Sequence, residues 1–295
     1  MDNESGAPLA DAAGTITIGG DLTVNRLGFG AMRLTGEGIW GPPADRDEAL
    51  RVLVRAIELG VNFIDTANSY GPYHSEELIA EALFPYPEGL VIATKGGLER
   101  AGPDQWHPNG DPDNLRRELE GSLRRLMLDR VDLYQLHRID PEIPESEQLM
   151  ALREFLDDGL ARHVGLSEVT VEQLERARRV VPIASVQNRY NVEDQHWGWV
   201  LDRCESEGIA FLPWAPLSAG HISDDSAIAR VAERRDATPM QVAIAWLLAR
   251  SPVMLPIPGT SRVTHLEENV AAASLRLTQE DMEDLARAAT ESIPG

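Results

Sequence analysis

The feature that most constrains this chain is an eightfold alternation of short apolar runs with longer segments of helical periodicity. Each run has the length of a strand, and its lack of polar alternation indicates burial on both faces, as in a parallel sheet covered by helices. The runs span residues 27–32, 61–65, 90–95, 131–137, 161–166, 184–187, 210–214 and 253–257.

The segments between the runs repeat apolar residues every three or four positions, which predicts amphipathic helices. Thr238 precedes Pro239 at one predicted helix start, and Gly60, Gly159 and Gly208 stand at predicted helix ends. Eight strand–helix units in about 250 residues favour a closed α/β fold, the (β/α)8 TIM barrel, over an open doubly wound sheet. The predicted helices span residues 47–59, 75–83, 113–126, 145–158, 171–180, 196–207, 239–249, 263–273 and 279–290.

The chain is predicted to hold one domain, residues 15–295, because no polar linker interrupts the pattern. Residues 15–18 and 22–24 flank a Gly-Gly-Asp turn and predict a short β-hairpin before the barrel. Residues 1–14 carry acids in place of the basic and apolar regions of a secretory signal, and we expect a disordered tail there.

Composition excludes several classes of partner. The formal net charge of −21 disfavours nucleic acid and anionic membrane surfaces. The longest apolar stretch, residues 242–249, is far shorter than the roughly 18–20 residues of a membrane span. Cys204 is the only cysteine, so no internal disulfide forms, which fits a cytoplasmic location. The seven histidines show no metal-binding spacing, and we expect no metal.

A dinucleotide-binding Rossmann motif is also excluded. The segment LGFGAMR contains Gly-x-Gly after a predicted strand, and Glu48 follows about 20 residues later, as the motif requires. The third glycine is missing, and Glu48 lies inside a predicted helix. In a barrel, the site is expected instead at the carboxyl ends of the strands, where the following residues fall: Asp65, Lys95, His137, Ser167, Gln187 and Trp214.

Four of the residues near these ends suit hydride transfer to a carbonyl. Tyr70 donates a proton near neutral pH only if a neighbouring cation lowers its pKa from the reference value of about 10. Lys95 suits that role, and Asp65 would hold the Lys95 ammonium by a charge-assisted hydrogen bond. His137, as a neutral imidazole, would direct a ring nitrogen at the same carbonyl oxygen.

Seven motifs occur in an order that resembles the aldo-keto reductase superfamily over residues 26–289: NFIDTANSYG, IATKGG, VDLYQLHR, HVGLSEV, VQNRYN, WAPLSAG and IPGTSRVTHLEENV. Within it, GPPADRDEAL, PMQVAIAWLLARSP and IPGTSRVTHLEEN most resemble the bacterial branch that includes pyridoxal reductase. The resemblance implies reduction of an aldehyde or ketone, with Tyr70 as general acid in a tetrad with Asp65, Lys95 and His137.

The resemblance also implies an extended NADP(H) across the barrel mouth. Gly30 and Met32 would lie near the nicotinamide, Ser167 and Gln187 would hold its carboxamide, and Trp214 would stack on its ring. The free N–H groups before helix 263–273 would face phosphate. The remaining residues assigned to the cofactor are Asp65, Leu217, Gly259, Thr260, Ser261, Arg262 and His265, with Glu268 and Asn269 at the adenine.

Some positions depart from the family pattern. Glu168 replaces the usual Asn after the Ser that would hold the carboxamide. Its charge would alter the affinity for nicotinamide, unless the side chain turns outward. Ala215 replaces a common hydroxyl. Gly259 and His265 stand where Lys and Arg are often found, which leaves Arg262 as the main permanent cation for the 2′-phosphate. NADPH is still favoured over NADH.

The long connections after the first strand and after Lys95 bring three aromatic residues towards the pocket: Trp40, Tyr73 and Trp106. Aromatic walls suit a flat or apolar small-molecule carbonyl substrate, and pyridoxal is the first specific candidate. Two alternatives remain open. One is a Schiff-base lyase that uses Lys95 as an amine, and the other is an NADP(H)-binding regulatory subunit with little turnover.

Overall fold

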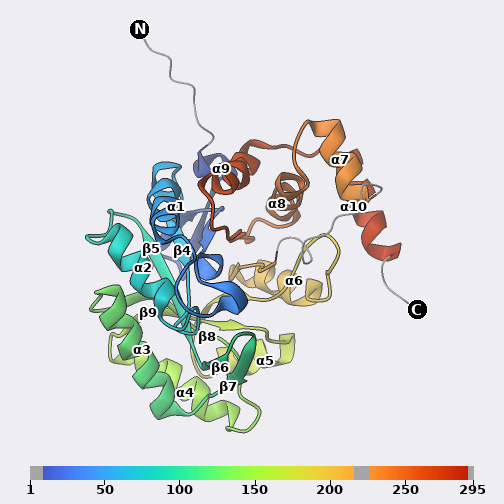
Figure 1. Ribbon diagram of the computed structural model, residues 1–295. Helices are drawn as coiled ribbons and strands as arrows, with labels where there is room; N and C mark the ends of the chain where they lie inside the picture. The colour runs from blue at the N-terminus through green and yellow to red at the C-terminus, as the bar shows by residue number, and fades with distance from the viewer. Residues whose placement is uncertain (1–8, 216–225, 292–295) are drawn as a thin grey trace.

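The centre of the molecule is a curved parallel sheet of seven strands, surrounded by helices (Figure 1). The computed structural model describes residues 9–215 and 226–291. Neighbouring strands lie in the order β11-β10-β9-β8-β5-β4-β3. Their bounds are β3 Phe29–Gly30, β4 Phe63–Asp65, β5 Val91–Gly96, β8 Val131–Leu136, β9 Ala161–Ser167, β10 Ile183–Gln187 and β11 Ala210–Phe211.

The eighth apolar run closes the sheet into a barrel. The amide of Phe211 donates to the carbonyl of Val253 at 2.9 Å, and the amide of Leu255 donates back to the carbonyl of Phe211 at 2.8 Å. On the other edge, the amide of Gly28 donates to the carbonyl of Pro256 at 2.9 Å. Extended backbone therefore joins the last strand to the first, and the predicted TIM barrel is confirmed.

The helices pack outside this barrel, and their ends follow the predicted signals. The hydroxyl of Thr238 accepts a hydrogen bond from the amide of Gln241, and the side-chain oxygen of Gln241 accepts one from the amide of Thr238. α7 was not predicted, because it lies in a segment interpreted as connection. The helices are α1 Arg46–Glu58, α2 His74–Leu83, α3 Pro112–Leu126, α4 Glu145–Asp157, α5 Val171–Arg178, α6 Gly198–Glu207, α7 Ala227–Arg235, α8 Pro239–Arg250, α9 Val263–Ala271 and α10 Gln279–Glu291.

The predicted amino-terminal hairpin is present as β1 Thr15–Ile18 and β2 Leu22–Asn25. Its side chains Ile18 and Val24 are fully buried in one cluster with residues from inside the barrel, among them Phe63 of β4. Phe63 begins its strand, so the hairpin covers the amino-terminal end of the barrel. The carboxyl ends of the strands are left to form the mouth.

Two expectations about local structure were wrong, and one hairpin was not predicted. Residues 10–13 form a 3-10 helix in place of a disordered tail, because the small Ala10 is buried and donates its amide to the Leu59 carbonyl at 2.9 Å. The predicted first strand ends at Gly30, and a 3-10 helix, Ala31–Leu34, follows. The connection after Lys95 is an antiparallel hairpin of β6 Leu98–Gly102 and β7 Gln105–Pro108.

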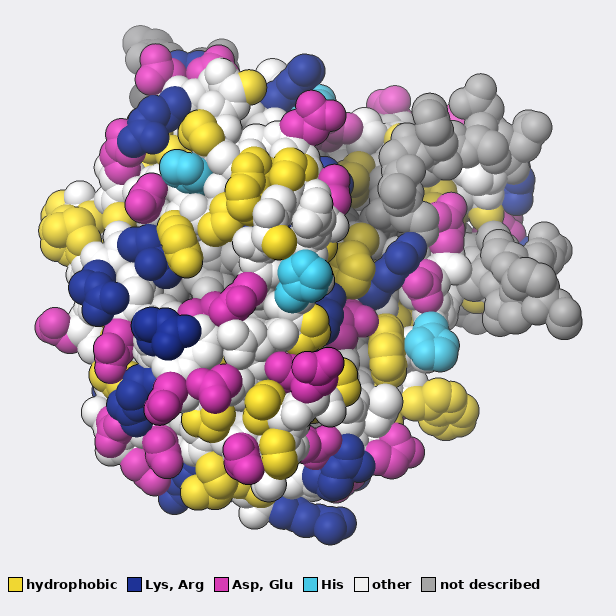
Figure 2. All heavy atoms as spheres, turned by 60° about the horizontal axis from the view of Figure 1, so that its bottom comes forward, with side chains coloured by type: hydrophobic (Ala, Val, Ile, Leu, Met, Phe, Trp, Pro, Cys, Tyr) yellow, Lys and Arg dark blue, Asp and Glu magenta, His cyan; other side chains and the backbone are white. Residues whose placement is uncertain are grey.

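The surface mixes charges of both signs. Figure 2 shows Asp and Glu side chains interspersed with Arg side chains over one face. Within the described residues, no helix has the length and apolar character that a bilayer span demands. The same residues hold no group of three or more His, Cys, Asp and Glu side chains placed to bind a metal ion.

Candidate active site

The structure brings the four residues of the expected tetrad together at the barrel mouth. Asp65 ends β4, Lys95 lies near the end of β5, and His137 directly follows β8. Tyr70 comes from the loop after β4. All four are buried, with exposed fractions of 0–6%. Lys95 is also the only lysine in the sequence, so any lysine-specific measurement reports on this site.

The Lys95 ammonium uses all three of its N–H donors inside the protein. Nζ lies 2.7 Å from Asp65 Oδ2, 2.7 Å from the carbonyl oxygen of Thr66 and 3.2 Å from Tyr70 Oη. Burial disfavours its charge, but the attraction of Asp65 and Tyr70 outweighs burial and raises the pKa of Lys95. Lys95 is therefore a cation, and an unprotonated amine for Schiff-base chemistry is disfavoured.

Asp65 is held by amide side chains as well as by Lys95. Its Oδ1 accepts from Gln187 Nε2 at 2.9 Å and from Gln135 Nε2 at 3.2 Å. These bonds satisfy both oxygens of the buried carboxylate. Gln135 was not identified from the sequence. The signal was a polar residue inside the otherwise apolar end of β8, at the run VDLYQLH.

Tyr70 is a protonated phenol in this environment. Burial raises the pKa of Tyr70, and the nearby Lys95 charge lowers it by less. From the sequence, the Lys95 cation was expected to set the direction in which the pKa of Tyr70 shifts. The direction of the Lys95 effect is as expected, but the net direction for the buried hydroxyl is the opposite. Tyr70 thus keeps its proton, and the Lys95 ammonium lies within hydrogen-bond distance of its oxygen.

His137 is a neutral imidazole, because burial first, and then the charges of Lys95 and Arg138, hold its pKa well below the usual range. Its ring meets the Tyr70 ring edge to face, with centroids 5.8 Å apart. Nδ1 lies 3.4 Å from the Ser69 hydroxyl oxygen. The other ring nitrogen, Nε2, is therefore the one available to a substrate oxygen.

Arg138 was overlooked in the sequence, although it ends the motif VDLYQLHR. Its Nη1 donates to the hydroxyl oxygen of Ser167 at 2.9 Å and to the carbonyl of His137 at 2.6 Å. Because Ser167 accepts this bond, its own hydroxyl hydrogen is left to donate elsewhere. Gln187 likewise binds Asp65 through its amide nitrogen and keeps its oxygen as an acceptor. The mouth thus presents one donor and one acceptor, the pair that a primary carboxamide needs.

An open cleft of about 620 Å³ extends from the first connection to the last. Four residues that the sequence motifs assign to the cofactor line this cleft: Met32, Gly259, Thr260 and Ser261. The backbones beneath it are very close, since a Cβ on Gly259 would lie 2.5 Å from the carbonyl oxygen of Gly30. Any larger residue at Gly259 would displace this backbone. The cleft therefore has no side chain at this point, which suits an extended group such as a dinucleotide.

The amino terminus of α9 differs from the expectation of free N–H groups. The amide of Val263 donates to Glu48 Oε1 at 2.9 Å, and the amide of Arg262 donates to the hydroxyl of Thr260 at 3.1 Å. The Glu48 carboxylate of α1 therefore occupies part of the expected phosphate position. The sequence did not predict this contact, because Glu48 and Val263 are far apart along the chain. The Arg262 side chain is exposed.

The other residues assigned to the adenosine end lie on α9 itself. His265 is exposed, Glu268 is half-buried and Asn269 is buried. The Glu268 carbonyl accepts from the side chain of Gln241 on α8 at 3.0 Å, which fixes this part of α9. Leu217 lies outside the described residues.

Arg100 contacts two aromatic side chains near the barrel mouth, Trp40 and Trp106. Its guanidinium donates to five backbone carbonyls, at Gly38, Ile39, Ser69, Gly102 and Gln105, and so joins the first connection, the Tyr70 loop and the β6–β7 hairpin. The same group lies 3.7 Å from the Trp106 ring centroid and 5.6 Å from that of Trp40. The ring centroids of Trp106 and His137 are 6.3 Å apart, so Trp106 lies next to the tetrad.

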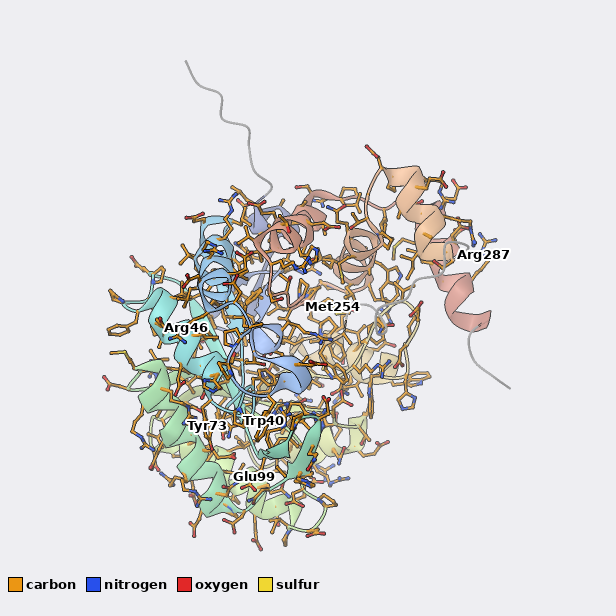
Figure 3. The ribbon with its side chains drawn as sticks, viewed as in Figure 1. Trp40, Arg46, Tyr73, Glu99, Met254 and Arg287 are labelled. Carbon is orange, nitrogen blue, oxygen red and sulfur yellow. The ribbon has the colours of Figure 1, made fainter. Side chains whose placement is uncertain are left out.

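Tyr73 does not join these aromatic residues. It adopts left-handed backbone, with φ of 72°, and its ring packs 4.3 Å from the guanidinium of Arg125 on α3. Its side chain is 49% exposed. In Figure 3, Trp40 lies over the β6–β7 hairpin while Tyr73 lies towards α3. The expected place of Tyr73 in the substrate wall was wrong, because the backbone turns there to begin α2.

Comparisons with known proteins agree with this geometry. The sequence profile of the aldo/keto reductase family matches residues 26–290. The chain belongs to the aldo/keto reductase family. It is 42% identical to pyridoxine 4-dehydrogenase of Escherichia coli, over 93% of this chain and 98% of that protein. It is 52% identical to an uncharacterized oxidoreductase of Schizosaccharomyces pombe, over 94% of this chain and 90% of that protein.

Solved structures extend the agreement to the fold. An aldo-keto reductase from Klebsiella pneumoniae in complex with NADPH superposes with a TM-score of 0.79 at 26% identity, over 92% of this chain and 94% of that one. As an aldo/keto reductase, the protein is an NADP(H)-dependent oxidoreductase that interconverts a carbonyl and an alcohol. The regulatory and lyase alternatives are not favoured.

Proposed function

We propose that this aldo/keto reductase reduces an aldehyde or ketone with NADPH and that Tyr70 is the general acid. The observation that carries the proposal is the contact of Tyr70 Oη with the buried Lys95 ammonium at 3.2 Å. A phenol that is protonated at rest and lies beside a fixed cation is suited to give up its proton only when charge develops on a substrate oxygen.

The chain's own residues account for the proton and the developing charge. Tyr70 Oη donates its proton to the carbonyl oxygen, and the Lys95 ammonium stabilises the phenolate that remains. His137 Nε2 donates a hydrogen bond to the same oxygen, and Asp65 balances the Lys95 charge. When bound, NADPH supplies the hydride. Tyr70 recovers a proton from water after the alcohol leaves.

The residues along the mouth and the cleft are proposed to hold the cofactor. The Ser167 hydroxyl and the Gln187 carbonyl group would bind the carboxamide, and the Trp214 ring would cover the nicotinamide. Arg262 would bind the 2′-phosphate. The rest of the proposed set is Gly30, Met32, Asp65, Leu217, Gly259, Thr260, Ser261, His265, Glu268 and Asn269.

Pyridoxal is the first specific substrate that we propose. The 42% identity to pyridoxine 4-dehydrogenase supports an aldehyde at position 4 of a pyridine ring. Trp106, fixed by Arg100 next to His137, offers a flat wall for such a ring. Trp40 lies on the other side of Arg100 and would border the entrance.

A substrate panel tests the proposed function directly. Purified protein with NADPH should oxidise the cofactor over many turnovers with pyridoxal, and more slowly with simple aldehydes, quinones and sugars. Measurement of NADPH absorbance at 340 nm follows each reaction. A single turnover of bound cofactor with no further reaction on any carbonyl would favour a regulatory subunit. A borohydride-trapped adduct on Lys95 would favour the lyase.

Arg262 is the residue whose loss should separate the two cofactors. Arg262→Ala should raise the Kd for NADPH by about one to two decades, because a charge-assisted hydrogen bond contributes about 1.5–3 kcal/mol, while the Kd for NADH stays within about twofold. Fluorescence titrations measure both constants. Arg153→Ala, which removes an exposed arginine of α4, is the matched control. Equal losses for both cofactors would place the 2′-phosphate contact elsewhere.

A further inference from the structure

Glu168 links three neighbouring strand ends at the barrel mouth. It directly follows β9, and its Oε1 accepts from the indole Nε1 of Trp214 at 2.6 Å and from the backbone amide of Arg189 at 2.7 Å. Arg189 comes after β10, and Trp214 comes after β11. A single carboxylate oxygen therefore joins the ends of three strands, and Glu168 does not turn outward as one expectation allowed.

The backbone of Glu168 adopts a conformation that is unfavourable for a residue with a side chain. Its φ of 56° lies in the left-handed region, which residues with a Cβ rarely adopt. The Glu168 amide donates to the carbonyl of Gln187 at 3.0 Å, so backbone and side chain both bind the next strand. A strained residue persists where its surroundings fix it in this way, and such residues cluster at functional sites.

The bond to Glu168 restricts the ring of Trp214. An indole has one N–H donor, and a carboxylate acceptor makes that hydrogen bond strong. The Arg189 guanidinium lies 5.8 Å from the ring centroid and contacts the same side chain. The plane of the half-buried Trp214 ring is thus set by residues of two other strand ends.

We infer that Glu168 is a positioning residue, which holds the Trp214 ring in the orientation needed to cover the nicotinamide. This inference rests on the proposed function, in which Trp214 stacks on the cofactor. Glu168 and Trp214 then act as one unit. The carboxylate itself binds no part of the substrate, and its effect on the cofactor passes through the indole.

A double-mutant cycle in NADPH binding tests this coupling. Glu168→Ala should raise the Kd for NADPH about tenfold in the wild-type background, as expected from loss of a charge-assisted hydrogen bond. In a Trp214→Phe background, which keeps an aromatic face but has no N–H, the same change should raise Kd less than about twofold. Glu168→Ala removes the bond to the Arg189 amide in both backgrounds. The contribution of that bond therefore cancels when the two changes in Kd are compared.

Two further variants separate positioning from charge. Glu168→Gln keeps an acceptor oxygen and should bind NADPH within about threefold of wild type. Glu172→Ala removes an exposed acid on α5 nearby and is the matched control. Equal losses for Glu168→Ala in both Trp214 backgrounds would overturn the inference. A Glu168→Gln protein as weak as Glu168→Ala would also overturn it, because the charge would then matter more than the hydrogen bond.

The free protein provides a readout that needs no cofactor. The six tryptophans give six indole N–H resonances in a ¹⁵N spectrum, and Trp214→Phe identifies the one from Trp214. That resonance should move upfield in Glu168→Ala, with the others nearly unchanged, and an unmoved resonance would overturn the inference. A wild-type protein that shows the indole bond but binds no NADPH would overturn the proposed function, and with it the role at the nicotinamide.

Discussion

Replacement of Tyr70 by phenylalanine should lower kcat for carbonyl reduction by about 10²–10⁴-fold, the range that general acid catalysis commonly contributes. The change removes only the hydroxyl that lies 3.2 Å from Lys95 Nζ. The Kd for NADPH should stay within about twofold, because the hydroxyl is not part of the proposed cofactor contacts. Steady-state kinetics with the best carbonyl of the panel, together with cofactor titration, measure both values.

Tyr86→Phe is the matched control for this change. The Tyr86 hydroxyl also donates a hydrogen bond, to the carbonyl of Leu126 at 2.7 Å, but it lies away from the tetrad. We expect this variant to keep full turnover. If Tyr70→Phe retained near-normal kcat with the fold intact, another group would have to donate the proton, and the role assigned to Tyr70 would be wrong.

Lys95→Met should lower kcat by at least about 10²-fold, because the phenolate of Tyr70 would lose its stabilising cation and the pKa of Tyr70 would rise further. It should also destabilise the fold, since removing one partner of a buried ion pair costs about 3–5 kcal/mol. The two Gln side chains that bind Asp65 would offset part of this cost. Turnover assays and denaturant unfolding measure the two effects.

The double variant Asp65→Asn/Lys95→Met separates these effects. Removal of both charges should recover much of the free energy of unfolding but none of the turnover. Recovery of turnover as well would show that Lys95 acts only through stability. Because Lys95 is the only lysine, isotope-labelled lysine in the wild type gives one side-chain signal, which should report an ammonium from about pH 6 to pH 9.

The order of elements and the location of the site were predictable from sequence, because both depend on local patterns and on topology. Eight apolar runs that alternate with helices in about 250 residues favour a closed barrel, and parallel strands bring their carboxyl ends to one mouth. Asp65, Lys95 and His137 each lie at such an end, so their convergence follows from the chain order. α7 was missed because its short amphipathic segment lies in a long connection.

The sequence by itself therefore determined the barrel and the residues that meet at its mouth, since periodicity, strand ends and motif order are properties of neighbouring residues. Only the tertiary structure decided how those residues act on one another. Burial outweighs the Lys95 charge at Tyr70, Glu48 reaches the start of α9, and Glu168 holds Trp214. Such effects depend on desolvation and on the directions of side chains from distant segments, which no local pattern specifies.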